Sequence, residues 1–224
     1  MQRRQFTSAA LLGWALPWRS HAAGLGEADA ALGVRTALER GAEAAVSLLG
    51  RRDGFLGNAK VRIPLPGVLQ DAEPLLRLSG QQHRVDELVT AMNRAAEAAV
   101  PHARALLVDA VRTLTVADAL RIVRGDDTAV TDYFERRTRE PLAGRFLPIV
   151  TRETERVSLA EKYNAVARRA SGLGLVKPED ADIASYVTRK ALDGLYWMIG
   201  EEEKKIRRDP VGTGSDILRQ VFGG

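Results

Sequence analysis

Apolar residues recur at every third or fourth position in nearly every long segment of this chain, which is the period of an α-helix. The segment 178–208 shows the pattern most clearly, with acidic residues in its first turn and basic residues in its last, an order that the helix dipole favours. Its predicted buried face consists of Ile183, Val187, Ala191, Leu195 and Met198. We therefore predict an all-α fold, a single compact domain of about eight or nine helices with one long helix near 178–208.

Glycine, proline and capping patterns mark where the helices are expected to begin and end. Thr115 with Asp118, and Ser158 with Glu161, show the spacing of a capping box. Pro141 is expected to separate two helices, because proline lacks the N–H that a helix interior needs. Short helices are expected at 115–125 and 216–222, and longer ones at 28–49, 68–78, 84–100, 102–114, 128–139, 141–157, 158–170 and 178–208.

Residues 51–67 are the one stretch without helical periodicity. Turn-forming pairs occupy 53–54 and 57–58, and two prolines two positions apart exclude a central strand. Apolar residues follow in the period of an extended strand, at Val61, Ile63 and Leu65. We expect an extended arm that lies across the helices, or at most a small hairpin.

The first 22 residues read as a cleavable export signal. Arg3 and Arg4 precede an apolar run of 13 residues at 6–18, and small residues before the end of the signal place the cut after Ala22. A membrane-spanning helix needs about 20 apolar residues, so no span is expected after cleavage. The paired arginines resemble a twin-arginine signal, and the choice between that route and the general secretory route stays open. We expect a periplasmic protein whose single domain covers 23–224.

Composition excludes several kinds of site and partner. The chain has no cysteine among its 224 residues, which excludes disulfides, thiolate metal sites and thiol nucleophiles. His83 and His102 have no partner at metal-ligand spacing, so neither a metal nor another cofactor is predicted. Loss of the signal removes three arginines and no acid, which leaves 30 basic against 29 acidic residues. This near-neutral balance argues against a nucleic-acid partner.

Two polar residues interrupt an alanine-rich helix and form the first candidate site. Asn93 and Glu97 lie four apart, hence on one face of the helix. A carboxylate among alanines could act as a ligand clamp in a low-dielectric pocket. The alternative is structural, with Glu97 paired to an arginine of a neighbouring helix.

A second candidate stripe lies on the long helix, and it mixes aromatic and charged residues along one edge. Such an edge could line a groove for a polar-headed ligand or for a partner helix. The alternative is an intrahelical Lys190–Asp193 pair at the core boundary. The nearby acids 201–203 point about 100° apart and cannot converge on a cation, so we interpret them as a solvated helix end. The stripe consists of Tyr186, Lys190, Asp193 and Trp197.

Several segments together resemble one family. They are GFLGNAKVRIPLPG, MNRAAEAAVP, GDDTAVTDYF, KYNAV and the long EDADIASYVTRKALDGLYWMIGEEEKKIRRDPVG. They look like the secreted bacterial proteins grouped as domain-of-unknown-function family 4197, over about residues 30–222. The resemblance implies an exported protein of one helical domain, and it implies no activity, ligand or catalytic residue.

The sequence favours a binding role over catalysis. It has no nucleophile elbow, phosphate-binding glycine loop, zinc-protease motif or dinucleotide fingerprint. We expect a non-catalytic protein that holds an amphipathic or lipid-like small molecule between its helices. The alternatives are a carboxylate-type hydrolase, for which no catalytic residue can be named, and an envelope scaffold that contacts a protein partner through the arm. The candidate partner contacts are Phe55, Leu56, Lys60 and Arg62, although the two apolar ones would serve equally to cover the core.

Overall fold

The computed structural model describes residues 27–209, and their side chains from Ala31 onward. The expected export signal and the expected helix at 216–222 lie outside the described residues. The all-α prediction is confirmed, because the described chain is helical and contains no strand. Its α-helices are α1 (Glu27–Leu49), α2 (Gly67–Leu78), α3 (Gln82–Ala99), α4 (Arg104–Arg112), α5 (Val116–Arg124), α6 (Ala129–Thr154), α7 (Ser158–Gly172) and α8 (Ile183–Arg208).

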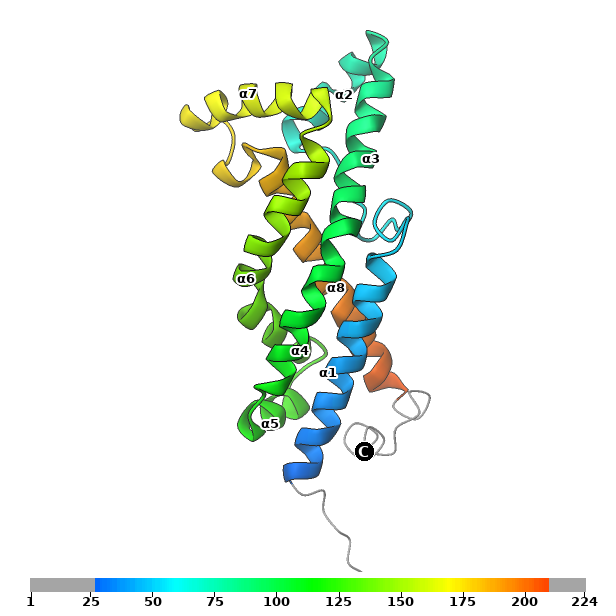
Figure 1. Cartoon of the computed structure of the whole chain (residues 1–224), viewed down its shortest axis with the longest axis vertical. Helices are drawn as coiled ribbons and strands as arrows, with labels where there is room; N and C mark the ends of the chain where they lie inside the picture. Colours follow the sequence, from blue (N-terminus) through cyan, green and yellow to red (C-terminus); the bar gives the residue numbers. More distant parts are fainter. Residues whose placement is uncertain (1–26, 210–224) are drawn as a thin grey trace, which may run out of the picture.

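Four helical rods run along the long axis of the molecule and alternate in direction (Figure 1). They are α1, α3 continued by α4, α6, and α8. A 3-10 turn at Val100–Ala103 joins α3 to α4. The helices α2 and α7 lie at one end of the bundle and α5 lies at the other (Figure 1). The helix α8 packs against the other three rods, through α1, α3 and α6.

The long helix α8 buries the face that its sequence predicts. Val187, Ala191 and Leu195 are fully buried. The helix begins at Ile183 and not at Pro178, because residues 178–180 form a separate 3-10 turn. Asp182 then caps α8, and its side chain accepts a hydrogen bond from Ser185 N at 3.1 Å.

The two helices expected on either side of Pro141 are one continuous helix, α6, so the predicted break is wrong. Pro141 and Pro148 both lie on its exposed side, where carbonyl groups that lose a helical partner can turn to water. The opposite side is anchored by fully buried Leu142, Phe146 and Val150. Packing of this apolar side outweighs the local cost of the prolines.

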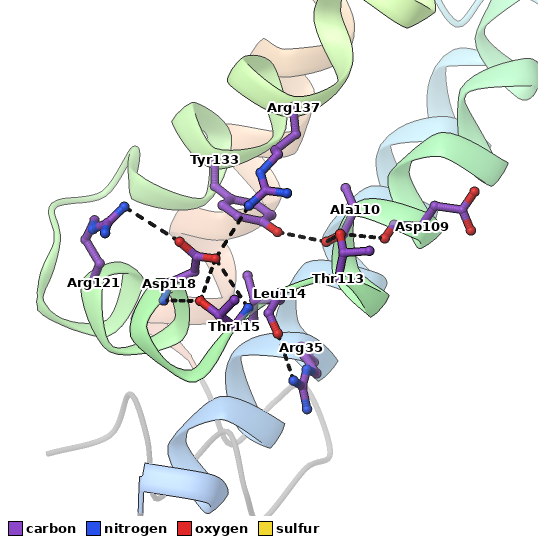
Figure 2. Close-up of polar contacts among 10 residues, drawn as sticks. All are labelled: Arg35, Asp109, Ala110, Thr113, Leu114, Thr115, Asp118, Arg121, Tyr133 and Arg137. Carbon is purple, nitrogen blue, oxygen red and sulfur yellow. Dashed lines mark hydrogen bonds and ion pairs between the residues drawn. The ribbon is translucent and has the colours of Figure 1, made fainter.

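One of the two expected capping boxes forms, at the start of α5 (Figure 2). Asp118 N donates to Thr115 Oγ1 at 3.1 Å, and Thr115 N donates to Asp118 Oδ2 at 3.3 Å. The hydrogen bond from the Thr115 side chain is the main reason that the pKa of Asp118 lies below its ordinary value. The second expected box is wrong, because α7 begins one residue earlier than that pattern requires, with Val157 as its cap.

Polar contacts beside this capping box also connect α4 to α6. Tyr133 OH donates to Ala110 O at 2.8 Å, and the Arg137 guanidinium lies 5.4 Å from the centre of the Tyr133 ring (Figure 2). Arg137 also points toward Asp118, at 3.7 Å (Figure 2). These polar groups hold helices to one another, and we assign them a structural role.

The start of α6 is capped from α8. Glu203 is buried, and its carboxylate accepts hydrogen bonds from Val130 N and Thr131 N, each at 3.2 Å. Arg207 donates to the same carboxylate at 2.9 Å. Burial raises the pKa of Glu203. The interpretation of 201–203 as a solvated helix end is therefore wrong for Glu203, although the two acids before it do pair with lysines at the surface.

Candidate functional site: the arm and the groove between α6 and α8

The segment between α1 and α2, residues 51–66, forms an arm of consecutive turns followed by an extended stretch. Gly57 N donates to Asp53 O at 3.1 Å, and Arg62 N donates to Asn58 O at 2.8 Å, which closes the turns. The extended stretch then alternates as predicted, with its apolar residues buried and the residues between them exposed. The arm is present, and the alternative of a hairpin is not. The buried residues of the extended stretch are Val61, Ile63 and Leu65.

Glu97 holds the first half of the arm. It is buried on α3, and its Oε1 accepts hydrogen bonds from Phe55 N at 3.0 Å and Leu56 N at 3.1 Å. Its Oε2 accepts from Arg94 Nη1 at 2.6 Å, and Arg94 Nη2 reaches Asp53 at 2.8 Å. An arginine does pair with Glu97, but it is on the same helix and not on a neighbouring one.

Asn93 holds the second half of the arm. Its Oδ1 accepts from Ile63 N at 2.9 Å, and its Nδ2 donates to Ile63 O at 3.0 Å. The side-chain amide therefore satisfies both backbone groups of Ile63, as a neighbouring strand would. Nδ2 also donates to Val89 O at 2.8 Å, so this fully buried amide has no unsatisfied atom.

Tyr186 and Gly194 form the other side of the clamp, on α8. Tyr186 OH donates to Pro64 O at 3.1 Å, and burial raises the pKa of Tyr186 to about 12. Gly194 gives space to Phe55, since a Cβ at Gly194 would stand 2.7 Å from Phe55 Cε1. Three of the sequence-predicted ligand residues thus bind the arm of this same chain. Gly194 and Arg94 were missed, because neither type of residue signals such a contact in a sequence.

The rest of the predicted stripe does not form one site. Asp193 pairs with Arg139 of α6 at 2.9 Å, and the expected pair with Lys190 is absent from the described residues. Lys190 Nζ lies 6.0 Å from the centre of the Tyr186 ring. Trp197 is 39% exposed.

The four predicted partner contacts separate into two kinds. Phe55 is fully buried and Leu56 is half-buried, whereas Lys60 and Arg62 are exposed. The apolar part of the arm covers the core, and its outer surface is cationic.

A groove of about 390 Å³ lies between α6 and α8. Its wall on α6 contains Ala143, Gly144 and Leu147, and a Cβ at Gly144 would meet no atom within 4 Å. Arg139 stands at one end, in contact with Asp193, and it stacks on the Tyr196 ring at 5.1 Å. The wall on α8 consists of Ser185, Thr188, Arg189 and Leu192.

Two polar atoms along this groove lack a partner. Thr188 is 5% exposed, and its Oγ1 has no hydrogen-bond partner among the described residues. Arg189 Nε is likewise buried without one, although the other end of that guanidinium pairs with Asp180. Buried polar groups are normally satisfied, so these two atoms are exceptions among the buried polar atoms of the described residues.

A second hollow of about 630 Å³ continues the groove toward α7 and shares Leu147 and Ser185 with it. Its lining is more polar and includes Asn164, Arg168 and Asp182. The first hollow is mostly apolar, whereas polar residues from the end of α6 and from α7 line the second.

The described residues contain no cluster of three or more His, Asp or Glu side chains that could hold a metal ion. Within the same part of the chain, no helix has both the length and the apolar character that crossing a bilayer requires.

The fold and the site define the class of this protein: it is an all-α bundle with a clamped arm and a lateral groove. The family model described as "Protein of unknown function (DUF4197)" matches residues 24–223, and the chain belongs to that family. Comparison with curated proteins and with solved structures gives no significant match.

Proposed function

We propose that the protein is an exported, periplasmic protein that binds a small amphipathic molecule in the groove between α6 and α8. The observation that carries the proposal is the unpartnered hydroxyl of Thr188 in the wall of a mostly apolar groove. The polar residues predicted from the sequence, Asn93 and Glu97, are engaged by the arm, so they are not part of the proposed site.

The lining of the groove favours a particular ligand chemistry. Ala143, Leu147 and Leu192 suit an alkyl chain, since burial of a CH₂ group is worth about 0.8 kcal/mol. The polar side chains that line the groove can all donate hydrogen bonds, although both guanidinium groups already pair with a carboxylate, Arg139 with Asp193 and Arg189 with Asp180. These side chains are Arg139, Ser185, Thr188 and Arg189. Donors of this kind suit a head group that accepts hydrogen bonds, such as a carboxylate or a phosphate.

Titration calorimetry with dodecanoate tests the site directly. Gly144→Leu fills the groove, and Gly172→Leu makes the same chemical change on α7, where a Cβ also meets no atom within 4 Å. We expect the native protein and Gly172→Leu to bind dodecanoate alike. We expect Gly144→Leu to bind it at least roughly tenfold more weakly, a difference of about 1.4 kcal/mol. Equal binding by the two variants contradicts the assignment of the site.

A further inference from the structure

The outer surface of the arm and the adjacent edge of α8 carry a group of cations, which we call the cationic face. None of its five members forms an ion pair with an acidic residue of the described chain. The arm has one acid, Asp53, and Arg94 already binds it. No ion pair of the described residues therefore engages the cations of this face. The cationic face consists of Arg51, Arg52, Lys60, Arg62 and Lys190.

Lys60, Arg62 and Lys190 belong to one surface because the arm runs alongside α8, and Arg51 and Arg52 are exposed at the start of the same arm. Val61 packs at Gly194, where an added Cβ would be 3.3 Å from Val61 Cβ, and Pro64 O accepts the hydrogen bond of Tyr186. Lys190 lies one helical turn from both Tyr186 and Gly194, on the side of α8 that the arm follows. Buried and exposed residues alternate along the arm, so Lys60 and Arg62 are exposed beside Lys190.

Trp197 extends the same surface by one turn. It follows Gly194 by three residues, so it lies on the arm side of α8, and its side chain is 39% exposed. An exposed indole next to several unpaired cations is the combination that a lipid–water interface favours.

The backbone of the arm, which carries four of these cations, is held against the bundle. Glu97 and Asn93 bind its backbone at three residues, and Phe55 is fully buried beneath it. Figure 1 shows the turns of the arm standing out from the side of the bundle between α1 and α3. A rigid, protruding loop meets an extended surface with little loss of conformational entropy.

We propose that the cationic face docks the protein on the surface of an anionic phospholipid bilayer. Lysine and arginine near an anionic leaflet each contribute roughly 1 kcal/mol, which is about a fivefold gain in partitioning. The bundle itself stays outside the hydrocarbon core. The groove between α6 and α8 is a separate site, and this proposal does not depend on it.

Vesicle co-sedimentation of the purified protein tests the proposal. We expect binding to phosphatidylcholine vesicles that contain phosphatidylglycerol, weaker binding as salt rises, and no binding to phosphatidylcholine alone. Lys60→Gln with Arg62→Gln should lower the partition coefficient roughly 20-fold. Arg145→Gln with Arg152→Gln removes the same charge from exposed positions of α6 that form no ion pair within residues 27–209, and it should lower the coefficient less than threefold.

Several outcomes would overturn the proposal. Equal losses from the two double variants would show a response to net charge alone. Displacement by millimolar inorganic phosphate would indicate a pocket for a single anion, and tighter binding to polyglutamate than to the vesicles would indicate an acidic protein partner. Circular dichroism of each variant checks that the helices are retained.

Discussion

The ring of Phe55 occupies the space that a side chain at Gly194 would need. A Cβ on Gly194 would stand 2.7 Å from Phe55 Cε1 and 3.3 Å from Phe55 Cζ. The glycine lies in the middle of α8, where its own helix propensity is poor. Its presence follows from the arm, which packs a fully buried aromatic ring against the helix at this point.

Gly194→Ala should therefore destabilise the fold, although alanine is the better helix former. We expect a loss of about 1–3 kcal/mol from overpacking, measured by urea unfolding. Gly144→Ala is the matched control, because a Cβ there meets open space, and it should raise the stability by up to about 1 kcal/mol. The account of the arm is wrong if both substitutions stabilise the protein.

Removal of the Glu97 carboxylate should release the arm. Glu97→Ala leaves two backbone N–H groups without their acceptor, and Arg94 keeps only its pair with Asp53. We expect a loss of about 3–5 kcal/mol. Glu97→Gln keeps one acceptor oxygen and should lose less. Hydrogen exchange at Phe55 and Leu56 should speed up in both variants, and unchanged exchange would contradict the clamp.

Thr188→Val separates stability from ligand binding. Valine has the shape of threonine without the hydroxyl, so it removes a buried atom that has no partner among the described residues. We expect the free protein to gain about 1 kcal/mol and a higher Tm, while its affinity for dodecanoate falls. A lower Tm would show that the hydroxyl already has a structural role.

The capping box of α5 makes a pH-dependent contribution. The pKa of Asp118 is lowered in the folded state, chiefly by the hydrogen bond from Thr115. The folded state thus favours the ionised carboxylate, so this contribution is present above the ordinary pKa of aspartate and is lost as pH falls through the lowered value. Thr115→Ala should cost about 1 kcal/mol at neutral pH. In chemical denaturation from neutral to acid pH, the difference between variant and native protein should shrink.

The tyrosines should resist ionisation in alkali. Burial raises the pKa of all four, and that of Tyr186 and Tyr196 to about 12. Because the folded state favours the neutral phenol, the stability contribution is present below pH 10 and is lost as pH rises from about 10 toward 12. Absorbance near 295 nm should change little at pH 10 and then rise together with unfolding. Full titration at the ordinary pKa in folded protein would contradict the burial of these rings.

Much of the fold could be predicted from the sequence because its signals are local. The core face of α8, the alternation of the arm and the capping box at Thr115 each depend on residues a few positions apart. The errors arose where tertiary packing overrode a local rule. Buried Leu142, Phe146 and Val150 keep α6 continuous past two prolines.

The candidate site was less predictable for a related reason. Asn93 and Glu97 stand out in the sequence as polar residues in an apolar setting, and both are indeed buried. Their partners lie 30 to 42 residues away in the chain, so a helical pattern cannot show whether they meet a ligand or the arm. The groove has no motif at all, since Gly144 and Thr188 are ordinary residues until α6 and α8 are packed together.

Native mass spectrometry of the protein recovered from its own host tests the central claim most directly. The account predicts a stoichiometric amphipathic ligand, retained by the native protein and by Gly172→Leu but absent from Gly144→Leu. A ligand-free mass for the native protein, or a ligand that Gly144→Leu retains in full, would contradict the proposal that the groove between α6 and α8 is the binding site.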